Sequence, residues 1–204
     1  MSDITDCRPP ADFDRAIVAF RRHAFAALLA GEAPRLAAIA EAASRDALGV
    51  ARALAWLDNH GQLERDGELL IGAHGLTHRP TPHTLAIGDR TLHTWCAYDA
   101  VAIPTALGIT ARAATRCPSC HQHLIITIHE GHLPDPSGMV LWLPSGPCQN
   151  VIDDFCTHAN LYCNPHHLDT WHHSAGRPPG RPVTLAEIPA LARNDWADVA
   201  PRQE

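Results

Sequence analysis

Trp95-Cys96-Ala97-Tyr98-Asp99 stands near the midpoint of this 204-residue chain, where a helical half gives way to a half rich in cysteine and histidine. The stretch places a thiol and a carboxyl three positions apart, and the apolar residues Val101, Ile103 and Leu107 follow it. If the segment is helical, positions 96 and 99 share one face. An acidic residue inside an apolar segment is costly to bury unless it is paired or used. The stretch therefore predicts a functional thiol–carboxyl pair on one helix.

The composition narrows the classes of function. No apolar run approaches the ~20 residues that cross a bilayer, and the acidic N-terminus lacks the pattern of a signal peptide. We therefore expect a cytoplasmic protein without a membrane partner. A formal net charge of -6 disfavours nucleic acid, and the absence of lysine excludes lysine nucleophiles. Seven cysteines in such a chain favour metal chemistry over a disulfide framework.

The first half predicts three helices and a hairpin, the layout of a winged helix-turn-helix. Apolar spacing indicates helices over residues 12–29, 35–42 and 45–59. Ser44 is the expected N-cap of the third helix, and two short strands follow around Asp66-Gly67. A DNA-binding interpretation needs a basic recognition helix, but the third helix carries only Arg45 and Arg52. We therefore expect a winged-helix-like three-helix domain over residues 1–80 that serves packing, with DNA an unlikely partner.

The second half, residues 81–204, predicts a small, mostly antiparallel sheet domain with flanking helices, so the fold class is α+β. Period-two patterns and turn residues indicate strands over 84–87, 91–95, 109–115, 124–129 and 139–143. Helices are expected over 96–107, 153–162 and 185–198. Pro104 should end or bend the first of these helices. A segment rich in proline, glycine and arginine predicts a flexible tail after about residue 174.

Cys117-Pro118-Ser119-Cys120 is a second candidate site, because two cysteines at this spacing form half of a zinc site or a redox pair. A zinc site needs two more ligands. Cys163 with His166 or His167 has suitable spacing, as does Cys148. Zinc here would have a structural role and hold together a loop-rich sheet. A thioredoxin-like interpretation is weaker, because no βαβ pattern surrounds the two cysteines.

Phe155-Cys156-Thr157-His158 is the third candidate. Cys156, on a predicted helix, is either a core residue or a second soft metal ligand opposite Cys96. A cysteine protease with His93 or His158 as its base is the enzyme alternative. It is disfavoured, because no nucleophile signature surrounds Cys96 and the remaining cysteines would have no role.

Taken together, these motifs resemble the alkylmercury (organomercurial) lyases. The resemblance rests on Leu92-His93-Thr94-Trp95-Cys96-Ala97-Tyr98-Asp99 and on Phe155-Cys156-Thr157-His158, with Cys117 and Trp171 as further matches. It extends from about Leu85 to Trp171, and the winged-helix-like first half also looks like that family. Cys120, Cys148 and Cys163 have no counterpart in the family pattern.

The resemblance implies that Cys96 and Cys156 bind mercury as thiolates and that Asp99 delivers a proton to carbon, giving a hydrocarbon and Hg(II). It implies an organomercurial substrate, no required cofactor, and cellular thiols or a mercuric reductase as the Hg(II) acceptor. Cys117 would be structural, or would join Cys120 and Cys163 in a second thiol or zinc site. Two alternatives stay open: a metal-binding winged-helix regulator, and a zinc-stapled homologue without lyase activity.

Overall fold

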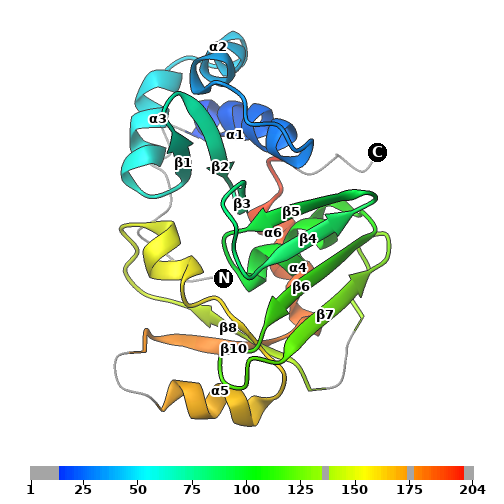
Figure 1. The fold of residues 1–204 in the computed structure, drawn as a ribbon. Coiled ribbons are helices and arrows are strands. Elements are labelled where there is room, and N and C mark those ends of the chain that lie inside the picture. The colour runs from blue at the N-terminus through cyan, green and yellow to red at the C-terminus, as the bar shows by residue number, and fades with distance from the viewer. Residues whose placement is uncertain (1–13, 135–137, 174–176, 200–204) are drawn as a thin grey trace.

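The structure is a computed structural model that describes residues 14–134, 138–173 and 177–199. It combines helices with two antiparallel sheets, which confirms the α+β class (Figure 1). Cys7 lies outside the described residues. Within the described part of the chain, no helix is both long and apolar enough to cross a bilayer.

Three helices form the first part of the fold, at the top of Figure 1: α1 (Asp14–Leu29), α2 (Leu36–Asp46) and α3 (Val50–Asn59). The predicted start of the third helix was wrong. The Ser44 hydroxyl donates to the Ala40 carbonyl inside α2, so Ser44 is not an N-cap. The chain breaks instead at Gly49, whose φ of 80° suits glycine, and Arg45 belongs to α2. The winged-helix comparison therefore stays a prediction.

The larger sheet has seven strands, and every neighbouring pair is antiparallel. Its strands are β1 (Leu63–Asp66), β2 (Leu69–Ala73), β3 (Leu76–Thr77), β4 (Thr84–Ile87), β5 (Arg90–Thr94), β6 (Ala111–Arg116) and β7 (His123–Ile128). The order is β1-β2-β3-β5-β4-β6-β7. Strands from both halves of the chain thus share one sheet, and a domain boundary near residue 80 stays a prediction.

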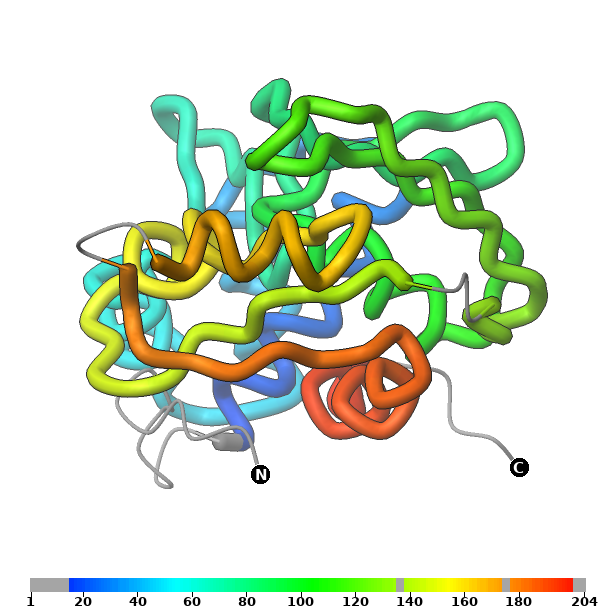
Figure 2. Tube along the Cα trace, turned by 90° about the horizontal axis from the view of Figure 1, so that it is seen from below, coloured from blue at the N-terminus to red at the C-terminus, as the bar shows by residue number. Residues whose placement is uncertain are grey.

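The smaller sheet has the order β10-β8-β9, built from β8 (Val140–Pro144), β9 (Leu161–Tyr162) and β10 (Gly180–Thr184). All five residues of β8 are buried. Helix α5 (Pro165–His172) contacts β8 and β9, and Figure 2 shows it running alongside them. The five strands expected in the second half of the chain are all present, within two residues at each end.

Two expectations for the second half were wrong. Residues 153–162 do not form one helix: the π-helix η2 (Val151–Cys156) ends at the cysteine, and β9 follows. The segment after residue 174 was expected to be flexible, but it includes β10. The helix expected over 185–198 is confirmed in part, as the 3-10 helix η3 (Leu185–Glu187) and α6 (Ile188–Asp195). The proline and glycine residues of this segment suggested a flexible chain, but several of its apolar side chains are buried: Val183, Leu185, Ile188, Ala192 and Trp196.

Helix α4 (Ala97–Leu107) lies at the centre of the molecule, behind strands β4 to β7 in Figure 1. It contacts α6, strands β5, β6 and β7 of the larger sheet, and β8 of the smaller one. All its residues from Ala97 to Pro104 are buried, which explains why the helix is apolar on every side. It continues past Pro104 and ends at Gly108, whose φ is 66°. The residue before α4 is Cys96.

Candidate functional site

Cys96 is held at the junction of strand β5 and helix α4, as the N-cap of the helix. Asp99, at the third helical position, accepts the backbone N–H of Cys96 at 3.2 Å, as the acidic residue of a capping box does. The Cys96 thiol also donates to Asp99 Oδ2, at 3.1 Å. The predicted thiol–carboxyl pair is therefore present on one helix turn, and capping supplies the local reason for its geometry.

Cys156 is brought to this pair by the π-helix η2. Asn150 caps η2 by accepting the backbone N–H groups of Ile152 at 3.0 Å and Asp153 at 3.1 Å. Val151 N–H donates to the His60 carbonyl at 2.9 Å, which docks η2 on the end of α3. As a result, the ligand atoms of Cys96, Asp99 and Cys156 all lie within 4.8 Å of one another. We refer to these three residues as the buried triad.

Burial controls the ionisation of the triad. The exposed fractions of Cys96, Asp99 and Cys156 are 0%, 5% and 3%. Burial raises the pKa of Asp99 to about 7, although the hydrogen bonds from Cys96 act in the opposite direction. Burial also raises the pKa of both thiols, and the nearby Asp99 charge reinforces this for each. At neutral pH the two thiols thus keep their protons, whereas the carboxyl is near the midpoint of its titration.

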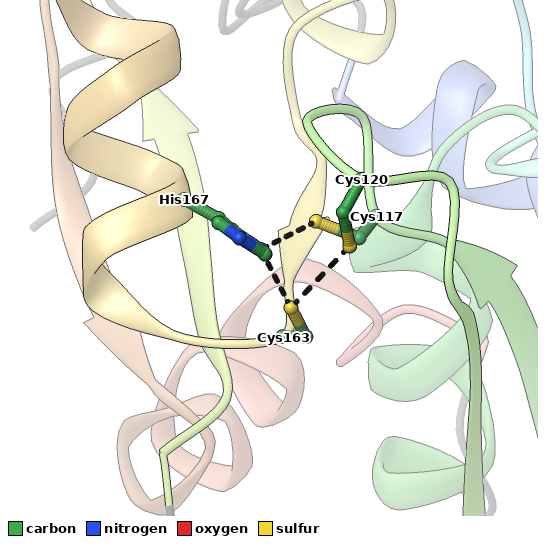
Figure 3. Close-up of side chains that lie close together, drawn as sticks. All are labelled: Cys117, Cys120, Cys163 and His167. Atoms are coloured by element: carbon green, nitrogen blue, oxygen red, sulfur yellow. Dashed lines mark hydrogen bonds between the residues drawn. The ribbon is translucent and has the colours of Figure 1, made fainter.

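A second group of side chains that could hold a metal ion connects the two sheets (Figure 3). Cys117 and Cys120 lie in the turn between β6 and β7, Cys163 follows β9, and His167 lies on α5. His167 Nδ1 is 2.8 Å from Cys163 Sγ and 3.7 Å from Cys117 Sγ. The sulfur atoms of Cys120 and Cys163 are 3.7 Å apart. We call these four residues the sheet-joining cluster.

The structure decides which of the histidines and cysteines with suitable spacing join the sheet-joining cluster. Of the two adjacent histidines, His167 faces the sulfur atoms, whereas His166 is exposed and outside the cluster. Cys148 is buried and disulfide-bonded, so the prediction of Cys148 as a possible zinc ligand was wrong. Burial alone would raise the pKa of Cys117, but backbone N–H groups of Cys163, Cys120 and Ser119 bond its sulfur and lower it to about 6.

The comparisons with known proteins identify the family. The sequence model of the family described as alkylmercury lyase matches residues 76–197, which contain both the buried triad and the sheet-joining cluster. The chain belongs to the alkylmercury lyase family. An alkylmercury lyase of Pseudomonas putida is 30% identical over 139 residues, or 63% of this chain and 65% of that protein. One of Staphylococcus epidermidis is 25% identical over 112 residues, 53% of this chain and 52% of that protein.

The chain thus covers less than two thirds of the length of these alkylmercury lyases. A solved structure supports the fold over a greater length. The crystal structure described as the mercury-bound form of MerB2 superposes with a TM-score of 0.79 at 20% sequence identity, and covers 95% of this chain and 94% of the other. The arrangement of helices and antiparallel sheets is therefore shared with that protein.

Two residues near the buried triad, Gly75 and Glu64, were not predicted from the sequence. Gly75, at φ 92°, approaches the triad so closely that a Cβ there would lie 2.9 Å from Asp99 Cγ. Glu64 on β1 accepts the indole N–H of Trp95 at 2.6 Å, and its charge adds to burial and Asp99 in raising the pKa of Cys156. Gly75 could have been noticed in the sequence, because a glycine in a turn often marks a positive φ or a close approach. Glu64 gave no such signal, because its contact with Trp95 spans 31 positions.

The histidines considered as protease bases do not join the triad. His93 Nδ1 accepts the backbone N–H of Thr81 at 3.2 Å. Neither His93 nor His158 belongs to the groups of close ligand atoms that the described residues form. The partner that Cys96 contacts is a carboxyl group and not an imidazole, which argues against cysteine-protease chemistry.

Proposed function

We propose that this chain cleaves the carbon–mercury bond of organomercurial compounds by protonolysis, releasing a hydrocarbon and Hg(II). The observation that carries the proposal is the buried triad, which puts two thiols and one carboxyl within 4.8 Å in a member of the alkylmercury lyase family. Hg(II) is a very soft cation and prefers thiolate to oxygen or imidazole ligands. Two thiols provide the metal ligands, and the carboxyl handles the proton.

Cys96 and Cys156 bind the substrate. An organomercurial RHgX exchanges X for a sulfur of the triad, and the displaced thiol proton leaves with X as HX. A second sulfur then coordinates the same mercury atom. Two thiolates increase the electron density on the Hg–C bond, so the carbon becomes basic enough to accept a proton. The balance is RHgX plus two thiols giving RH, HX and Hg(II) bound by two sulfurs.

Asp99 transfers the proton to carbon. The Cys96 thiol already donates to Asp99 Oδ2, so this carboxylate can take the proton and leave a thiolate for mercury. Protonated Asp99 then donates to the carbon, and the electron pair of the Hg–C bond forms the new C–H bond. A pKa of about 7 makes both forms of the carboxyl accessible at neutral pH. No cofactor is required for these steps.

Substrate reaches the triad only when residues that cover it move, because Cys96 is fully buried. The π-helix η2 carries Cys156 and is the least regular of the elements that contribute to the triad. After the reaction, Hg(II) remains on Cys96 and Cys156 until another thiol takes it. We propose cellular thiols or a mercuric reductase as that acceptor.

The test is incubation of the purified chain with phenylmercury and excess thiol, with benzene and Hg(II) measured over time. Wild-type protein should release both in equal amounts. Asp99→Asn should slow benzene release by about 10²- to 10⁴-fold, because it removes the proton donor and leaves both sulfurs. Asp153→Asn is the matched control, since Asp153 is an exposed carboxyl on the same π-helix as Cys156.

Two results would contradict the proposal. One is wild-type protein that binds phenylmercury and releases no benzene. The other is an Asp99→Asn variant that turns over at the wild-type rate, which would remove Asp99 from the reaction.

A further inference from the structure

We propose that Cys117, Cys120, Cys163 and His167 bind a structural Zn(II) ion that clamps the two sheets together. The described residues contain two groups of close ligand atoms, and this one has four members whereas the buried triad has three. Four sulfur and nitrogen ligands match the closed tetrahedral shell of a structural zinc site. The proposal does not depend on the proposed lyase activity.

The distances in the sheet-joining cluster suit a tetrahedron. Zn–S bonds of about 2.3 Å place two sulfur ligands of one tetrahedral zinc ion about 3.8 Å apart. The sulfur atoms of Cys120 and Cys163 are 3.7 Å apart, and Cys117 Sγ is 3.7 Å from His167 Nδ1. The separation of Cys163 Sγ and His167 Nδ1, 2.8 Å, is shorter than two ligands of one tetrahedral zinc ion would have. An outward shift of this pair would bring it to the spacing of a tetrahedral shell, and all four ligand atoms already lie within 4.8 Å of one another.

The surroundings of the four ligands fix their orientation. In the turn after β6, the His121 N–H donates to the Cys117 carbonyl at 2.8 Å, and His121 adopts a positive φ of 60°. The Ser119 hydroxyl donates to the His167 carbonyl at 2.7 Å, which ties this turn to α5. Asn164 caps α5 by accepting the His167 N–H at 2.9 Å. Such contacts hold metal ligands in place and support their affinity.

The ligand set favours zinc over the other metals that thiolates accept. Three thiolates exclude the hard cations, and one imidazole with tetrahedral geometry is typical of Zn(II). The donor set has no open position for a reacting water molecule, so the site is structural and not catalytic. This also separates the cluster from a thiol relay for Hg(II), which would need ligands that release the metal readily.

The clamp has a mechanical consequence for the buried triad. Cys117 and Cys120 lie in the turn between β6 and β7 of the larger sheet, whose strand β5 leads directly into Cys96. Cys163 follows β9 of the smaller sheet and comes seven positions after Cys156. Zinc would therefore fix the segment that carries Cys156 to the sheet that carries Cys96. In this way one metal ion holds the two halves of the triad in register.

The experiment measures the metal content of the full-length chain purified without added zinc and without chelators. Wild-type protein should contain about one zinc ion per chain, as four protein ligands form a complete site. His167→Ala, after dialysis against a competing chelator, should retain at least about tenfold less. His166→Ala is the matched control, because His166 is the adjacent exposed histidine, and Cys156→Ser controls for the triad; both should keep their zinc.

Cobalt substitution of wild-type protein keeps the test independent of how the variants fold. Co(II) in this site should give sulfur-to-cobalt charge-transfer bands and the intense visible bands of tetrahedral coordination. Wild-type protein that lacks zinc and shows no such spectrum overturns the proposal. So does zinc that is kept by His167→Ala and lost by Cys156→Ser, because the metal would then sit in the triad. A zinc-free cluster that takes up and releases Hg(II) overturns it in favour of the relay.

Discussion

The two cysteine clusters of this chain use the same thiol group in opposite surroundings. In the buried triad, the neighbour of Cys96 is a buried carboxyl, and the pKa values of both thiols are raised by burial. In the sheet-joining cluster, the neighbours of Cys117 are backbone N–H groups and an imidazole, and the pKa of this thiol falls to about 6. Within the same cluster, burial and the neighbouring sulfur atoms raise the pKa of Cys163 to about 12. The triad therefore keeps the protons of both its thiols, whereas the sheet-joining cluster holds Cys117 as a thiolate beside a protonated Cys163.

This difference teaches what each cluster is suited to do with a metal. A protein that ends a metal–carbon bond by protonation needs acid beside its sulfur atoms, and it needs to give the metal up afterwards. A structural site needs thiols that give up their protons when the metal binds, and a shell that is closed. Three ligand atoms that include a carboxyl fit the first demand, and four that include an imidazole fit the second.

The largest expected effect comes from removing one ligand of each cluster in turn, which tests whether the two clusters act separately. Cys156→Ser should lower benzene release from phenylmercury by at least about 10⁴-fold, because one of two mercury ligands is lost. Its zinc content should equal that of wild-type protein. His167→Ala should lose zinc, and its benzene release should fall by much less than that of Cys156→Ser, because both mercury ligands remain. Parallel assays of benzene and zinc in both variants decide this, and loss of both properties in both variants would show one coupled site.

How much of this contrast is visible in the sequence depends on distance along the chain. Cys96 and Asp99 could be paired from their spacing, because a helix turn is local and the capping geometry follows from it. Cys156 could not be placed beside them by spacing, since it is 60 positions from Cys96 and lies on a π-helix without a sequence signature. The residues alone left Cys156 as either a core residue or a second soft ligand, and only the family resemblance favoured the second.

The sheet-joining cluster shows the same limit. Cys117 and Cys120 were identifiable as half of a metal site, but His166 and His167 have nearly the same spacing to Cys163. The choice between them depends on how α5 is turned against β8 and β9, which is a matter of tertiary packing. The continuation of the larger sheet into the first half of the chain and the burial of α6 were hidden for the same reason.

The second expected effect is a pH dependence of stability that arises from Asp99 in the buried triad. Asp99 has a folded-state pKa of about 7 against 3.8 for the ordinary carboxyl, a difference worth about 4 kcal/mol. The folded protein binds the extra proton, so this contribution is fully present below pH 3.8 and is lost as the pH rises through about 7. Wild-type protein should therefore lose up to about 4 kcal/mol of unfolding free energy relative to Asp99→Asn between about pH 4 and pH 8.

Urea unfolding of both proteins across this pH range measures that difference. Groups elsewhere, including the sheet-joining cluster, are common to both proteins and cancel. A stability difference that does not change with pH would mean that Asp99 titrates normally. One that grows in favour of the wild type as the pH rises would give the shift the opposite sign.

The smallest of the three effects concerns the space around the Asp99 carboxyl. Gly75→Ala would place a Cβ 2.9 Å from Asp99 Oδ1 at a backbone φ of 92°, so the carboxyl must move. We expect a loss of about 2–3 kcal/mol of stability. Benzene release should fall by about 10²-fold, because a small displacement of a reacting group costs that much.

Gly67→Ala is the matched control, because Gly67 also has a positive φ, 58°, and no described residue beyond its chain neighbours has an atom within 4 Å of where its Cβ would lie. It should cost about 1 kcal/mol through backbone strain and leave the rate of benzene release unchanged. Strain alone would make the two variants alike, so an equal fall in activity would remove the close approach to Asp99 as the cause. Equal activity with wild-type protein in Gly75→Ala would mean that the carboxyl tolerates displacement, and that its proton rather than its position limits the reaction.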